Sequence, residues 1–207
     1  MGISLQKGQG VSLRKEAGFD LSRISIGLGW EVATADPAYD LDAVAFVLDN
    51  RGKVRDLGRL GGNGRPTLEG GDVVFYNSLQ HPSGKIRLSG DNQSGSAGGG
   101  DDETITVDLD TLPEQYAAIV FAVAIYKGKE RGQSFAGVRR AAIRALDAKG
   151  NEICRYDIGG KPENAAHCAM TFARAERDNG GGWLFRAVGE FHPTDRFIDI
   201  LKQYLPY

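Results

Sequence analysis

Alternation of apolar residues with small or polar ones, at a period of two, most constrains what this chain can fold into. From Ile24 to Trp30 every second residue is apolar, and the residues between are serine or glycine. Successive side chains of a β-strand point to opposite faces of a sheet, so this pattern is typical of a strand with one buried face. Comparable runs predict strands at 3–5, 11–13, 24–30, 41–48, 53–54, 72–77, 85–89, 103–109, 118–126 and 183–189, and a hairpin over 138–158.

Helices are expected at fewer places. A single helical turn is predicted near 134–137, before the hairpin. Asn164 is a suitable helix N-cap. Apolar or small residues at 165, 168, 169, 172 and 173 then form one stripe at helical spacing, which predicts a helix ending before Asn179. Thr194 is the expected N-cap of a second apolar stripe, which predicts a C-terminal helix at about 194–205.

These elements predict the fold class. The chain has 207 residues, and no linker or change of composition divides it. Many short strands separated by glycine-containing turns are typical of a sandwich or barrel. We therefore expect a mainly β fold, a β-sandwich of two antiparallel or mixed sheets with two or three peripheral helices, forming one domain over 1–207.

Composition excludes several classes of function. The formal net charge is −2, so the chain has no strong basic field to hold nucleic acid. The first residues lack the charged and apolar regions of a signal peptide. No apolar run reaches the roughly 18 residues that a membrane-spanning helix needs. Cys154 and Cys168 each lie in an apolar pattern and are predicted to be buried and unpaired. We expect a cytoplasmic protein with no direct membrane span and no nucleic-acid partner.

A glycine-rich acidic loop is the strongest functional signal. The segment from Gly90 to Glu103 carries four carboxylates and Asn92, together with five glycines. Glycine lets the backbone adopt positive φ and turn its carbonyl groups inward. Carboxylate, amide and carbonyl oxygens that converge on one point are what Ca²⁺ prefers, since this ion accepts 6–8 oxygen ligands in loose geometry. The alternative for this loop alone is a solvated acidic hairpin.

Polar residues at the ends of three apolar rows strengthen the metal interpretation. Asp42 shares a strand face with Val44 and the apolar residues that follow it, and Glu103 begins a similar row. Asn77 ends the row that contains Phe75. An unpaired carboxylate at the rim of a core is costly unless another group neutralises it. A shared cation at one end of a sheet stack would neutralise both.

Other metal and phosphate sites are disfavoured. The loop does not fit the EF-hand pattern, because the third position counted from Asp91 is Gln93 and the sixth is Ser96. The three histidines lie far apart in the sequence, and no HxxxH or CxxC pair is present, so a zinc or copper site is not expected. The glycine-rich segment 56–71 lacks the GK[ST] ending of a phosphate loop and is predicted to be an irregular insertion.

The residues in and around these loops resemble the TerD domain of tellurium-resistance and general-stress proteins. The matching pieces, in chain order, are Ser4–Gly8, Gly27–Trp30, Asp40–Ala43, Phe75–Asn77, Gly90–Asn92, Asp101–Glu103, Gln133–Phe135, Arg155–Asp157 and Phe185–Gly189. Each piece is short, but nine of them in order over most of the chain are specific. The resemblance implies a compact calcium-binding β-sandwich. It also implies a bacterial tellurite, phage or colicin resistance system whose partners include other Ter-type proteins, some of them membrane-associated.

The leading hypothesis is a non-catalytic calcium-binding module that acts as a scaffold or sensor in a stress response. Calcium would cancel the repulsion among the acidic side chains and order the loops into a binding surface. The expected ligands are Asp40, Asp42, Asn77, Asp91, Asn92, Gly95, Asp101, Asp102 and Glu103. The resemblance carries no catalytic residues. The family usually has further acidic residues in the interval from Gln93 to Gly100, which has no charge here. We therefore expect two calcium ions, or one if the uncharged interval costs the second.

Two other functions are kept open. Clustered carboxylates can hold metal ions for phosphoester hydrolysis, although no histidine or lysine stands near the acidic loops in sequence. A calcium-dependent binder of a small ligand, such as a sugar or nucleotide, could use Trp30, Tyr39 or Tyr76 as stacking faces. The same aromatic residues could instead fill a sandwich core.

Overall fold

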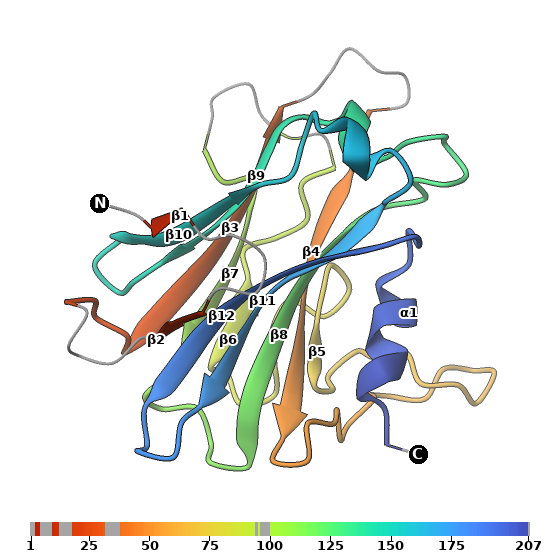
Figure 1. The fold of residues 1–207 in the computed structure, drawn as a ribbon. Coiled ribbons are helices and arrows are strands. Elements are labelled where there is room, and N and C mark those ends of the chain that lie inside the picture. The colour runs from red at the N-terminus through yellow and green to blue at the C-terminus, as the bar shows by residue number, and fades with distance from the viewer. Residues whose placement is uncertain are drawn as a thin grey trace.

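Two six-stranded sheets face each other in a computed structural model that describes residues 3–4, 10–12, 18–31, 38–93, 95 and 100–206 (Figure 1). The first sheet has the order β1 (Ile3–Ser4), β10 (Glu152–Asp157), β9 (Arg139–Leu146), β3 (Arg23–Glu31), β7 (Glu103–Asp108) and β6 (Ile86–Leu88). The second has the order β2 (Gly10–Ser12), β12 (Trp183–His192), β11 (Ala169–Arg177), β8 (Tyr116–Ile125), β4 (Leu41–Asp49) and β5 (Val73–Val74). Among the strands that the structure describes, β1 pairs with β10 in parallel and the other pairings are antiparallel. The predicted sandwich is confirmed.

The main core lies between the two sheets. Alternate residues of β3 and β7 point into it, including Ile24, Leu28 and Val107, as their period-two pattern predicts. Trp30 and Trp183 are both buried there. Burial of such large apolar side chains is the main favourable contribution to folding, at about 1.5–3 kcal/mol for each.

A second core covers the outer face of the β4–β8 sheet. Its apolar residues come from β4 and β8, from the segment 54–75 and from α1 (Phe197–Leu201). The ribbon shows α1 lying beside this sheet (Figure 1). As a result β4 is buried on both faces over Leu41–Leu48. The predicted C-terminal helix is confirmed as α1 and the 3₁₀ turn η4 (Lys202–Tyr204), and the turn predicted near 134–137 as η2 (Phe135–Gly137).

The helix predicted from Asn164 to Asn179 is wrong. After the 3₁₀ turn η3 (Pro162–Asn164) the chain forms strand β11, which pairs with β8 on one side and β12 on the other. Because β11 is a central strand, side chains on both of its faces are buried over most of its length. A strand covered on both faces has no alternating pattern, so its apolar residues can match helical spacing by chance.

The strand predicted at 53–54 is also wrong, and the Val54 amide instead donates to the carbonyl of Tyr204.

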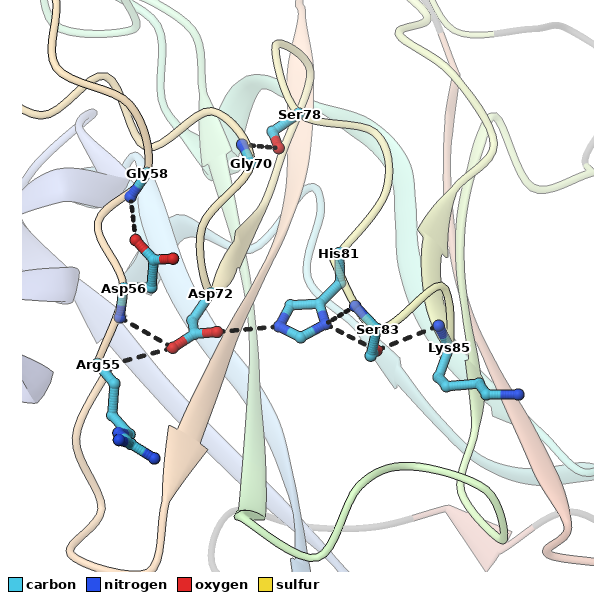
Figure 2. A network of polar contacts seen from close by, with 9 residues as sticks. All are labelled: Arg55, Asp56, Gly58, Gly70, Asp72, Ser78, His81, Ser83 and Lys85. Carbon is cyan, nitrogen blue, oxygen red and sulfur yellow. Dashed lines mark hydrogen bonds and ion pairs between the residues drawn. The ribbon is translucent and has the colours of Figure 1, made fainter.

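The segment 56–71 is irregular, as predicted, and a buried hydrogen-bond network anchors it. Asp72 accepts backbone N–H groups of Arg55 and Asp56 and contacts His81, with Asp72 Oδ1 3.1 Å from His81 Nε2 (Figure 2). The other ring nitrogen of His81 lies 2.8 Å from Ser83 Oγ. The network joins the insertion to the turn before β6.

Both cysteines are free and buried, as predicted. Burial raises the pKa of the Cys154 thiol to about 12 and also raises the pKa of Cys168, whose Sγ donates to the carbonyl of Gln133.

In the described part of the chain, no helix combines the length and apolarity needed to cross a membrane.

Candidate metal centre

Three carboxylates meet at one end of the sandwich. Asp40 lies just before β4, Asp42 is the second residue of β4, and Asp91 follows β6. One oxygen from each lies within 4.8 Å of the other two. Asp40 and Asp42 come from the second sheet and Asp91 from a loop of the first, so the fold itself brings residues some 50 positions apart to one point.

This cluster is electrostatically unfavourable without a counter-ion. Asp42 is only 5% exposed, and burial together with the charges of Asp40, Glu103 and Asp91 raises its pKa to about 8. Burial and the charge of Asp91 also raise the pKa of Asp40. Oδ1 of Asp40 is buried and has no hydrogen-bond partner. Buried polar atoms are nearly always satisfied in folded proteins, so this oxygen marks a place for a missing partner.

Glu103 lies beside the cluster and joins the two sheets. It begins β7 in the first sheet, and its Oε2 accepts the backbone N–H of Ala43 in β4 at 2.7 Å. Its Oε1 accepts the N–H of Asn92 at 3.2 Å. Burial nevertheless raises the pKa of Glu103 to about 7, against the lowering effect of these two hydrogen bonds. Glu103 therefore fixes the spacing between the acidic loop and β4 and adds to the negative potential.

Asn92, Gly95 and Asp102 fold the acidic loop. Asn92 Oδ1 accepts the N–H of Gly95, and its amide nitrogen donates to Asp102. Asp102 Oδ2 accepts the N–H of Trp30 at 2.9 Å. Gly95 has φ +64°, and a Cβ there would overlap the Trp30 ring. These groups shape the loop around the indole. Glycine carbonyls near 95–99 are also expected to complete the shell of the ion, and residues 96–99 lie outside the described residues.

Asp101 does not join the three carboxylates. Both of its oxygens accept hydrogen bonds from the guanidinium of Arg144 in β9, at 2.9–3.2 Å. The turn at 100–101 packs on β3, where a Cβ at Gly27 would overlap the Asp101 carboxylate and a Cβ at Gly29 would overlap the Gly100 carbonyl. A metal-ligand role for Asp101 would require it to leave Arg144.

Arg144, Gly27 and Gly29 were not among the predicted site residues. One signal in the sequence could have found them: the apolar residues of β3 alternate with Gly27 and Gly29 rather than with ordinary polar residues. In a strand, such glycines often mark the close approach of another backbone.

Asn77 lines a cavity that Asp42 also borders. Of the three aromatic residues considered for ligand stacking, Tyr76 lines this cavity, whereas Trp30 and Tyr39 are buried in the main core. The Trp30 indole donates to the carbonyl of Tyr39.

The donor set fits a hard cation. Within the described residues, the group of three contains carboxylates only, with no histidine or cysteine. His81 contacts Asp72 and Ser83, and His192 contacts Thr171. Oxygen-only donors in irregular geometry suit Ca²⁺ better than zinc, and Mg²⁺ demands a tighter octahedral shell. The unpartnered Asp40 oxygen and the raised carboxylate pKa values are what removal of a cation from such a site would leave.

Comparisons with known proteins agree with the fold and with the motifs. A family model described as the TerD domain matches residues 1–204. The tellurium resistance protein TerX of Serratia marcescens is 46% identical over 99% of this chain and all of its own length. TerD of the same organism is 38% identical over 92% of this chain and 91% of its own. General stress protein 16U of Bacillus subtilis is 35% identical over 91% and 90%.

Solved structures share the fold. A homologue of telluride resistance protein TerD from Streptomyces coelicolor superposes with a TM-score of 0.69 at 24% identity, and covers 90% of this chain and 99% of its own.

Proposed function

Because this chain belongs to the TerD family, whose relatives include tellurium resistance and general stress proteins, we propose that it is a calcium-binding module of a bacterial stress-response system. In this proposal it acts as a scaffold or sensor for other Ter-type proteins, some of them membrane-associated, and has no catalytic role.

The observation that carries the proposal is the unpartnered oxygen of Asp40 within the group of three carboxylates. An acidic cluster alone is common on protein surfaces. Here Asp40 and Asp42 are 9% and 5% exposed, so their charges cannot be screened by water as surface charges are. A divalent cation would satisfy the orphan oxygen and cancel most of the repulsion. The described carboxylates gather at one point, which supports one ion there.

Calcium would act on this chain by holding together parts whose charges repel one another. Asp40 and Asp42 belong to the β4 sheet, and Asp91 belongs to the loop that Asn92 and Asp102 shape against Trp30. When bound, the ion supplies the positive charge that lets these carboxylates approach one another. The loop would then change from a repelled to an ordered state, which is the two-state element that a sensor needs.

The direct test is a calcium titration by calorimetry, with bound ions counted by native mass spectrometry. We expect one ion with micromolar affinity, about −8 kcal/mol. Asp42→Asn should weaken binding at least tenfold, because it keeps the shape of the side chain but removes one charge.

The matched control is Asp49→Asn at the other end of β4. Asp49 accepts the N–H groups of Arg51 and Lys53 in a turn, and an asparagine oxygen can do the same. Its substitution should leave calcium affinity unchanged. Equal losses in the two variants would mean that overall acidity, rather than a formed site, attracts the ion.

A further inference from the structure

The largest unexplained feature near the metal centre is a cavity of about 450 Å³ that Asp42 borders. It lies on the outer face of the second sheet, between the turn after β5, the segment after β8 and the start of α1. Its volume falls within the range of about 300–1,000 Å³ that is usual for small-molecule sites. The two sites meet at Asp42, so a molecule in the cavity could reach a cation held by that carboxylate.

The cavity has an apolar floor and aromatic walls. Phe75, Phe197 and Leu68 are buried and form the apolar part of its lining. Tyr126 and Ile198 border it and are each 37% exposed, which is unusual for large apolar side chains in this fold. Aromatic and aliphatic walls of this kind favour a ring, through burial and edge or face contacts.

Backbone strain is concentrated at the same place. Among the described residues, only Leu68, Lys127 and Arg140 have positive φ without being glycine, and the first two line this cavity at φ 67° and 53°. A non-glycine residue in this conformation costs roughly 1–2 kcal/mol. Glycine would remove that cost. Packing in the second core accounts for the Leu68 side chain, whereas Lys127 is exposed, and its strained backbone directs attention to the cavity that it lines.

The charges of the lining do not favour an anion when no metal is bound. Asp42, Glu130 and Asp195 oppose Lys127 and Arg196, so the metal-free cavity has no excess of positive charge. A dication held by Asp42 would place positive charge at the edge of the cavity. Three carboxylates also leave part of the 6–8 oxygen shell of Ca²⁺ open to a ligand.

We propose that this cavity binds an organic phosphate that carries an aromatic ring, of about the size of a nucleoside monophosphate, with its phosphate completing the shell of the cation at Asp42. The ring would lie against Tyr76, Tyr126 and Phe197. Lys127 and Arg196 would pair with the phosphate, for which charged donors are well suited. This inference rests on the proposed calcium site and makes the protein a sensor of two ligands together.

The test uses adenosine 5′-monophosphate and phenyl phosphate as probes, titrated by calorimetry into protein with matched calcium in cell and syringe. Calcium binding is measured first. We expect both probes to bind with calcium and neither to bind in EDTA. Adenosine and inorganic phosphate should each bind at least tenfold more weakly than adenosine 5′-monophosphate.

Two failures are distinguishable. Absence of calcium binding would overturn both the proposed function and this inference. Calcium binding without binding of either probe, or equal probe binding in EDTA, would overturn this inference alone. Tighter binding of benzoate than of phenyl phosphate would also overturn it, since it would identify a carboxylate site.

Variants distinguish a role of these side chains in probe binding from a role in the stability of the fold. Tyr126→Ala should weaken probe binding roughly tenfold, equivalent to about 1.4 kcal/mol, without changing calcium affinity. Tyr156→Ala is the matched control, because Tyr156 also has a lysine over its ring but lies on β10 of the other sheet. Lys127→Gly should keep or raise the melting temperature while it weakens probe binding. A lower melting temperature with unchanged probe binding would show that Lys127 serves the fold only.

Discussion

At the scale of single residues, Asp42 makes the metal-free protein sensitive to pH. Its pKa is raised to about 8 and that of Glu103 to about 7, whereas unfolded carboxyl groups titrate near 4. Between these values the folded state holds protons that the unfolded state has released. The free energy of unfolding must therefore fall as pH rises from about 4 to 8.

We predict that the melting temperature in EDTA decreases between pH 5 and pH 8, and that calcium removes most of this decrease. Asp42→Asn should raise the metal-free stability at pH 8, by an amount on the order of 1 kcal/mol or more, since one pKa unit corresponds to about 1.4 kcal/mol. Thermal melts at several pH values measure both effects. A metal-free melting temperature that rises over this range would contradict the assignment of buried, mutually repelling carboxylates.

His81 provides a second residue-scale prediction. Burial alone would raise the pKa of Asp72, but hydrogen bonds from His81 and from the backbone of Asp56 and Arg55 outweigh burial and lower it. His81→Ala leaves this buried carboxylate without one partner, so it should cost about 3 kcal/mol of unfolding free energy. The loss should be fully present above the ordinary pKa of an aspartate, about 4, and should shrink as the pH falls below it. Urea denaturation at about pH 6 and about pH 3 measures it.

The control for His81→Ala is an exposed ion pair in the same insertion. Arg59 contacts Glu69, and their side chains are 77% and 36% exposed. Arg59→Ala should therefore change stability by less than about 0.5 kcal/mol. A similar loss in both variants would show that the insertion, rather than the buried pair, contributes the stability.

At the scale of elements, the glycines of β3 determine where the acidic loop lies. Gly27→Ala would place a methyl group in the space of the Asp101 carboxylate. The turn at 100–101 must then move away from Arg144, and the displacement passes to the neighbouring Asp102 and Glu103. We predict a loss of about 1–3 kcal/mol of unfolding free energy and weaker calcium binding. Calorimetry and denaturant melts together measure these effects.

Gly62→Ala is the matched control, since a Cβ there has no neighbour within 4 Å and the backbone conformation is ordinary. It should leave stability and calcium affinity nearly unchanged. If Gly27→Ala were equally neutral, the close packing of the loop on β3 would have no energetic consequence.

Elements with one covered face were predictable from alternation alone. Of the strands covered on both faces, β4 and β8 were predicted from their continuous apolar runs, and β11 was not. The alternation in β3 and β7 gives both the strands and their buried rows. The rows of Asp42 and Glu103 do point into cores, but into different ones, because β4 is covered outside by α1 as well as inside. For the same reason β11, between β8 and β12, lacked a strand pattern and was mistaken for a helix.

At the scale of the whole molecule, the proposed metal centre would connect the two sheets. Asp42 lies in one sheet with Asp40 directly before its strand, and Asp91 lies in the loop that follows β6 of the other, so an ion bound to all three would oppose separation of the sheets. We predict that calcium at a hundredfold excess over its Kd stabilises the native state by about 2.7 kcal/mol. Amide exchange should slow in β4 and β7 together. Protection limited to the acidic loop would contradict this cross-sheet role.

The meeting of Asp40, Asp42 and Asp91 could be anticipated from the sequence, because each stands at the end of an element that a sandwich brings to one rim. The pairing of Asp101 with Arg144 could not, because it depends on the register of β9 against β3 and on the absence of side chains at Gly27 and Gly29. The cavity beside Asp42 was also invisible, since its walls come from three segments with no shared pattern.

The burial of both thiols has a practical consequence for spectroscopy. Cys154 and Cys168 are enclosed and resist ionisation, and maleimides react with the ionised form. The natural chain should therefore need no cysteine removal before site-specific labelling. A single cysteine introduced at exposed Gln203, within the 3₁₀ turn η4 that follows α1, would carry a dye next to the element that forms one wall of the cavity. One substitution would thus allow the occupancy of the cavity to be followed by the fluorescence of the dye in the folded protein.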